Sequence, residues 1–85
     1  MQRKKRKIRK EIDMRISFNE MFQHNQNKAA RDLNEFIQGT TSLNKLRRRW
    51  PSNVRSVVYK MERAGVDRAR RSAYGALRSR GFVIV

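Results

Sequence analysis

The 85-residue chain contains no cysteine and a single histidine. Disulfide bonds and thiolate metal sites are therefore excluded, and the lack of cysteine fits a reducing compartment. Long apolar runs are also missing, since no stretch approaches the roughly 18 residues that a membrane-spanning helix needs. Glu11 and Asp13 follow the basic N-terminus where a signal peptide would be apolar, so we do not expect secretion. These absences predict a protein that is cytoplasmic, or associated with a nucleoid, a nucleus or a virion.

Acidic residues are scarce, with seven Asp and Glu against 22 Lys and Arg. Asp32 and Glu35 are near neighbours on a predicted helix, but Lys28 and Arg31 lie close enough to neutralise them. His24 stands among polar residues, without a second histidine at metal-binding spacing. The four glycines are dispersed and form no phosphate-binding loop. We therefore expect no enzymatic activity, no cofactor and no metal site.

The positive charge is concentrated at the two ends of the chain. Residues 1–10 contain seven basic and no acidic side chains, whereas residues 11–40 contain three basic and five acidic ones. Residues 41–85 contain twelve basic and two acidic side chains. A net charge of +15 repels itself, and a polyanion such as nucleic acid relieves that repulsion. The distribution indicates a nearly neutral folding segment between two regions that bind a polyanion.

The spacing of apolar residues changes near residue 18, and this change predicts a strand followed by a helix. Alternation over residues 12–18 predicts a strand. A helical period follows over residues 18–38. Ser17 and Glu20 have the spacing of a capping box for this helix, and Gly39 is a natural stop.

The second half of the chain is predicted to be helical, with two interruptions. A short helix over residues 43–50 ends where Pro51 biases the preceding residue away from α geometry. Apolar stripes then predict helices over residues 52–64 and 66–80. The two stripes are also compatible with one long helix, and we favour two because Gly65 lies between them.

A short apolar segment at residues 82–85 predicts a second strand, which would pair with residues 12–18. The predicted fold is therefore α+β, a predominantly helical small domain with an N-terminal strand, three to four helices and a short C-terminal strand. Residues 1–10 are predicted to form a flexible basic arm, because seven like charges in ten residues resist collapse. Residues 11–85 are predicted to form the single domain.

The predicted helix over residues 52–64 carries a basic face opposite its apolar stripe. Arg55, Tyr59 and Arg63 follow one another at intervals of four, with Lys60 beside them. Arginine forks onto phosphates or guanine edges, and tyrosine stacks or donates a hydrogen bond. A solvated polar face is the alternative interpretation, and the local excess of positive charge favours binding.

Arginine outnumbers lysine by 15 to 7, which favours bidentate contacts with phosphate. Three consecutive arginines before Trp50 cannot share one side of a helix, so at least one is expected to point toward the core edge or a partner. Trp50 itself is expected in the core. The remaining predicted phosphate contacts are Arg47, Arg48, Arg49, Arg68, Arg71 and Arg78, and in the arm Arg3, Lys4, Lys5, Arg6, Lys7, Arg9 and Lys10.

We interpret the chain as a non-enzymatic protein that binds nucleic acid, either DNA or RNA. In the favoured form it is a small DNA-binding regulator, in which residues 43–64 form a helix-turn-helix-like segment. In the alternative form it is a structural component of a nucleic-acid-containing assembly, such as a ribosomal or phage particle. A homo-oligomer or larger assembly would then form through the helix at 18–38 and the terminal strands. An acidic protein partner is a third interpretation.

Overall fold

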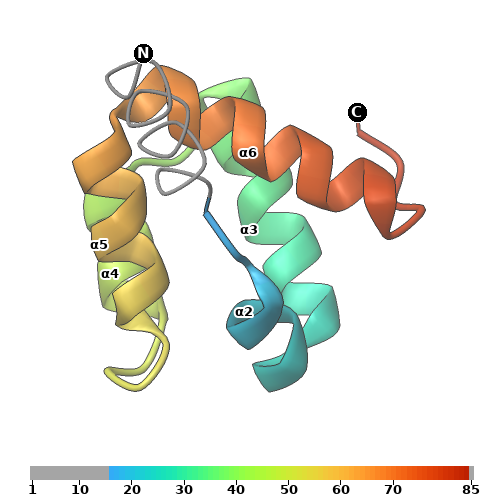
Figure 1. Cartoon of the computed structure of the whole chain (residues 1–85). Helices are drawn as coiled ribbons and strands as arrows, with labels where there is room; N and C mark the ends of the chain where they lie inside the picture. Colours follow the sequence, from blue (N-terminus) through green and yellow to red (C-terminus); the bar gives the residue numbers. More distant parts are fainter. Residues whose placement is uncertain (1–15, 85) are drawn as a thin grey trace, which may run out of the picture.

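The computed structural model describes residues 16–84, which form helices joined by turns and irregular segments. The helices are α2 (Asn19–His24), α3 (Gln26–Gln38), α4 (Leu43–Arg49), α5 (Arg55–Ala64) and α6 (Val66–Ser79). Figure 1 shows α3 at the centre, α2 below, α4 and α5 along one side and α6 across the top. α3 packs against α2 and α6, and α5 packs against α4 and α6. Within the described range, no helix combines the length and the apolar character needed to cross a bilayer.

The predicted α+β fold is wrong, because residues 16–84 contain no strand. Residues 12–15 of the predicted N-terminal strand lie outside the described range, and residues 16–18 form an irregular segment that leads into α2. Ile16 and Phe18 are only 8% and 2% exposed, and both belong to the core formed by the helices. Their alternation therefore reflects burial against helices rather than pairing in a sheet.

The predicted C-terminal strand is also wrong for its described part. Phe82 follows α6 in an irregular segment, and its ring stacks on that of Phe22 in α2 with 5.8 Å between centroids. The side-chain amide of Asn34 in α3 donates a hydrogen bond to the carbonyl of Val83 at 3.1 Å. The segment thus packs on helices α2 and α3, while Val85 lies outside the described residues.

The first long helix predicted from the sequence is divided at Asn25, which has extended backbone angles (φ −161°, ψ 102°). The side chain of Asn25 accepts a hydrogen bond from the backbone N–H of Lys28 at 3.0 Å and so caps α3. The capping box predicted at Ser17 is wrong, since Phe18 precedes α2 without a side-chain cap. The break costs little burial, because residues 23–27 are all exposed.

Three other helix ends lie where the sequence predicts them. Gly39 ends α3 in the left-handed conformation (φ 83°), which glycine adopts without steric cost. Ser42 caps α4, and Trp50 ends it in an extended conformation ahead of Pro51. Gly65 separates α5 from α6 with φ 95° and ψ 155°. The prediction of two helices here, rather than one, is confirmed.

Replacing Gly39 with alanine is expected to lower the free energy of unfolding by about 1–2 kcal/mol, because a Cβ crowds the following carbonyl in the left-handed region. Gly75→Ala is the matched control. It makes the same change inside α6, where nothing lies within 4 Å of the added Cβ, and should stabilise by about 0.5–1 kcal/mol. Thermal unfolding followed by circular dichroism measures both. Shifts of the same sign in the two variants would contradict this account.

Within the described range, apolar side chains from helices α2 to α6 and from residues 16–18 form one core. The prediction that Trp50 is a core residue is confirmed, since it is 1% exposed. Ala69 and Ala73 of α6 are completely buried, and their small side chains let α6 lie closely on α3. The other large buried side chains are Phe18, Phe36, Met21, Leu33, Leu46, Met61 and Leu77.

Candidate nucleic-acid interface

A buried carboxylate ties the end of α4 to α3. Asp32 is fully buried, and its Oδ2 accepts a hydrogen bond from the indole Nε1 of Trp50 at 3.0 Å. Arg49 Nη1 lies 3.3 Å from Asp32 Oδ1 and 3.3 Å from Glu35 Oε1. Buried charges are retained when they are paired and hydrogen-bonded, as this one is. The cluster fixes the position from which the turn into α5 begins.

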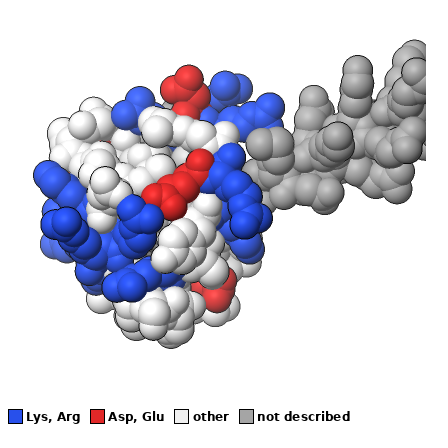
Figure 2. Space-filling model, turned by 90° about the vertical axis from the view of Figure 1, so that its left-hand side faces the viewer, with Lys and Arg blue, Asp and Glu red and all other residues white. Residues whose placement is uncertain are grey.

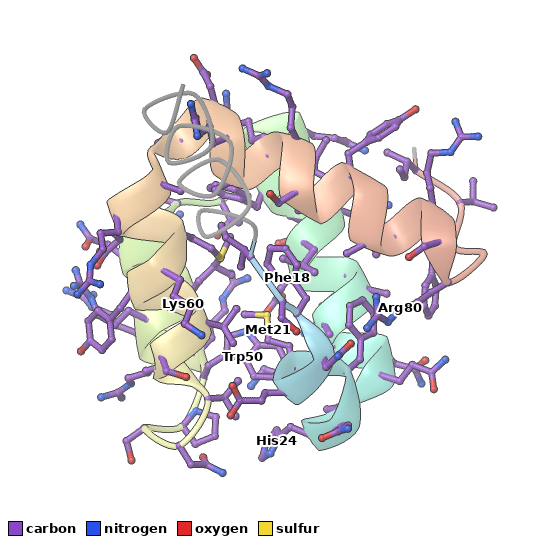
Figure 3. All side chains as sticks on the ribbon, viewed as in Figure 1. Phe18, Met21, His24, Trp50, Lys60 and Arg80 are labelled. Atoms are coloured by element: carbon purple, nitrogen blue, oxygen red, sulfur yellow. The ribbon has the colours of Figure 1, made fainter. Side chains whose placement is uncertain are left out.

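The face of Trp50 is covered by polar side chains at the surface. Lys28 Nζ lies 4.7 Å from the centre of the indole ring and donates to the backbone carbonyl of Arg49 at 2.6 Å. His24 is exposed, and its ring centroid is 5.8 Å from that of Trp50. Figure 3 shows Trp50 inside the molecule and His24 at its lower surface. Within the described residues, no three His, Cys, Asp or Glu side chains are grouped so as to hold a metal ion.

The three consecutive arginines have three different environments. Arg47 Nη1 forms an ion pair with Glu62 Oε2 of α5 at 3.1 Å. Arg49 is held by Asp32, which confirms that at least one of the three points toward the core edge. Arg48 is exposed and makes no hydrogen bond or ion pair with any described residue. Of the three, Arg48 is therefore the one whose donors are all available to a ligand.

The predicted basic face of α5 is present on the surface, except for its first arginine. Arg55 is half-buried, and its Nε donates to the carbonyl of Trp50 at 3.1 Å. Tyr59 is 49% exposed. Lys60 and Arg63 are exposed and unpaired within the described part of the chain. Tyr59, Lys60 and Arg63, which we call the α5 face, lie within one helical turn of each other.

Within the α5 face, Lys60 lies at the edge rather than at the centre. In Figure 3, Lys60 projects from the front of α5, on the side of the helix toward Phe18 and α2. One residue corresponds to about 100° of helical rotation, so Lys60 and Tyr59 point in distinct directions. A ligand on Tyr59 and Arg63 would meet Lys60 at its margin.

Figure 2 shows the side of the molecule on which α4 and α5 lie in Figure 1. Lys and Arg side chains gather toward both margins of this side, with acidic side chains between them. Glu62 is the one acid in residues 43–64, against seven basic residues. The ion pair with Arg47 neutralises Glu62, so residues 43–64 keep a strong excess of positive charge.

The predicted cations of α6, Arg68, Arg71 and Arg78, are all exposed. Arg78 Nη1 donates to the Tyr74 hydroxyl at 3.4 Å, and its guanidinium carbon lies 5.8 Å from the ring centre. Arg71 lines one part of an open groove of about 500 Å³ between α6 and residues 16–19. The outer side of α6 is thus as basic as that of α5.

Tyr74 and Arg80 are not among the site residues predicted from the sequence. Tyr74 is 43% exposed beside Arg78. Its position four residues before an arginine repeats that of Tyr59 before Arg63, and this spacing is a signal available in the sequence. Arg80 lies over the Phe22 ring at 4.2 Å and donates to the carbonyl of Ala76 at 3.2 Å. No spacing rule predicts the contact between Arg80 and Phe22, because the two residues are far apart in the chain.

The seven predicted cations of the N-terminal arm, Arg3 to Lys10, lie outside the described residues.

Comparisons of the chain with protein-family models, with curated proteins and with solved structures found no match. The site must therefore be interpreted from its own geometry and charge.

Proposed function

We propose that the chain is a non-enzymatic nucleic-acid-binding protein that uses the α5 face as a contact surface. The observation that supports this most directly is the exposure of Tyr59 beside two cations, Lys60 and Arg63, that no described acid neutralises. Cations of this kind bind phosphates with release of counterions. An exposed aromatic ring beside them offers a stacking surface for a base.

The contacts of the predicted site residues support two different roles within this proposal. Arg47, Arg49 and Arg55 are engaged by Glu62, by Asp32 and by the carbonyl of Trp50, so they chiefly position the helices. Arg48, on α4, has free donors and adds to the contact surface. Because these contacts hold the helices in place, less conformational entropy is lost when the exposed side chains on those helices bind a ligand.

The favoured specific form is a DNA-binding regulator in which α4 and α5 act as a helix-turn-helix. The connection between them runs over residues 50–54, slightly longer than the usual three or four residues. The proposal of nucleic-acid binding does not depend on this geometry, because it rests on exposed charge. A clear preference for one duplex sequence would support the regulator.

The alternative is a component of a nucleic-acid-containing assembly, and the predicted terminal strands no longer support it. Residues 16–18 and 82–84 offer no strand edge for a neighbouring chain, and Phe82 and Ile84 are half-buried. Strong salt dependence without sequence preference, together with oligomers in light scattering, would favour this form.

Arg63→Gln is expected to weaken binding roughly fivefold and to reduce the salt slope of log K by about 1, because one phosphate is no longer neutralised. Arg31→Gln is the matched control, since it removes the same charge from a 66% exposed side chain on α3. Arg31 lies 3.7 Å from Asp32, and that carboxylate keeps its contacts with Arg49 and Trp50 in the variant. Fluorescence anisotropy with duplex DNA, single-stranded DNA and structured RNA over a salt series measures both. Equal effects in the two variants would show that net charge decides binding, and would contradict a role for the α5 face.

A further inference from the structure

Helices α5 and α6 carry the same three-residue arrangement. In each, an arginine, a tyrosine and a second arginine follow one another at intervals of four residues. The first set is Arg55, Tyr59 and Arg63, and the second is Arg70, Tyr74 and Arg78. Since residues four apart are neighbours on a helix, each set forms a continuous row along one side.

The first arginine of each row has the same structural role. Arg55 Nε donates to the carbonyl of Trp50, at the end of α4, at 3.1 Å. Arg70 Nε donates to the carbonyl of Phe36, in the last turn of α3, at 3.3 Å. Both arginines are half-buried. Each one donates to a carbonyl near the C-terminal end of a helix, where cations are favoured. The carbonyl of Phe36 also accepts from the N–H of Gly39.

The other two members of each row face the solvent. Tyr59 and Tyr74 are 49% and 43% exposed, and Arg63 and Arg78 are both exposed. The hydrogen bond from Arg78 to the Tyr74 hydroxyl uses one of its five N–H donors, so the remaining donors are available to a phosphate. The second row therefore has the same chemistry as the α5 face: a stacking ring beside a cation.

The two rows are carried by helices that run in different directions. Figure 1 shows α5 running along one edge and α6 running across the top, with the chain turning sharply between them. The turn is at Gly65, whose φ of 95° and ψ of 155° break the helix. Because α6 leaves the direction of α5 at this turn, a straight nucleic-acid segment bound along α5 does not follow α6.

We propose that Tyr74 and Arg78 form a second nucleic-acid contact, here called the α6 face, so that one chain bridges two nucleic-acid segments. This inference rests on the proposed function of the α5 face. Charge complementarity identifies the occupant, because α6 carries four arginines within residues 66–79 and a single acid, Asp67. Base stacking on Tyr74 adds an interaction that an acidic protein does not supply.

A bridging assay tests the inference. A biotinylated single-stranded DNA of about 20 nucleotides, somewhat longer than one typical binding site, is held on beads, and a fluorescent copy is offered in solution with the full chain. The wild-type chain is expected to retain the fluorescent strand. The variant Tyr74→Ala with Arg78→Gln should reduce retention about tenfold, while its affinity for one strand falls no more than about threefold. The same assay is repeated with duplex DNA.

Two variants serve as controls. Tyr59→Ala with Arg63→Gln should also reduce retention about tenfold while leaving binding through the α6 face. Tyr74→Phe should bridge like the wild type because the ring is kept. Light scattering gives the number of chains in each complex. Bridging at the wild-type level by the Tyr74/Arg78 variant, whether through a protein dimer or the N-terminal arm, would overturn the inference.

The proposed function and the inference fail in different ways. If the wild-type chain binds one strand but never retains a second, the bridging inference is wrong and the α5 face stands. If the folded wild-type chain binds no oligonucleotide at low salt, both are wrong.

Discussion

Trp50→Ala is expected to lower the free energy of unfolding by about 4–8 kcal/mol. About 3–5 kcal/mol comes from the cavity left by the indole ring, since Trp50 is 1% exposed. About 1–3 kcal/mol more is expected because the fully buried Asp32 loses the donor that now lies 3.0 Å from its Oδ2. A chain of this size has a total stability of about 4–13 kcal/mol, so the variant should be largely unfolded at 37 °C.

Trp50→Phe separates the two contributions. It keeps an aromatic ring in the core and beneath Lys28, but removes the N–H donor to Asp32. We expect a loss of about 1–3 kcal/mol in urea unfolding, smaller than that of Trp50→Ala. Tyr59→Ala is the control for Trp50→Ala, because it removes an aromatic side chain that is exposed. If Trp50→Phe were as stable as the wild type, the hydrogen bond to Asp32 would contribute nothing and this account would be wrong.

Salt is expected to have the largest effect on binding. If about six phosphates are neutralised, raising the salt from about 50 to about 200 mM should weaken nucleic-acid binding roughly 10³-fold. The physical reason is the release of condensed counterions, which becomes less favourable as the salt concentration rises. Anisotropy titrations at four or five salt concentrations give the slope of log K. A slope near zero would exclude phosphate binding as the main source of affinity.

The same titration tests the N-terminal arm. A variant in which its seven basic residues are changed to glutamine should bind more weakly and with a shallower slope, by about 0.9 for each phosphate that the arm no longer neutralises. An unchanged affinity and slope would show that the arm does not touch phosphates. The arm would then be a solubilising segment, and binding would rest on the helical part of the chain.

The positions at which helices end were predictable because each depends on local backbone chemistry. Gly39 and Gly65 have positive φ angles that other residues rarely adopt, and Trp50 is extended because Pro51 follows it. Asn25 uses equally local chemistry, but the apolar period on both sides of it obscured the break. Residues whose role is decided within four positions of the chain were the most predictable.

The strands were predicted wrongly because an apolar pattern indicates that side chains are buried, but does not show which element they are buried against. Ile16 and Phe18 alternate as in a strand, yet both are buried against helices. Phe82 belongs to an apolar run, yet its ring stacks on Phe22, sixty residues earlier in the chain. A distant partner decided each case, and neither partner is visible in a local window.

The sequence predicted which basic residues belong to the candidate site, but not which of them form ion pairs with acids. The sequence indicated that Arg47, Arg48 and Arg49 cannot all point the same way. Which of them would be neutralised depended on Glu62 and Asp32, acids 15 and 17 positions away.

The sequence by itself determined the excess of positive charge, the helix ends at glycine and proline, and the placement of Trp50 in the core. These properties follow from composition and from short-range backbone sterics. Only the tertiary structure decided that residues 16–18 and 82–84 pack on helices, that Arg47 and Arg49 are bound by acids, and that α5 and α6, which carry the two tyrosines, run in different directions. Those properties arise when segments distant in sequence are brought together, since burial, ion pairing and surface position are set by neighbours in space.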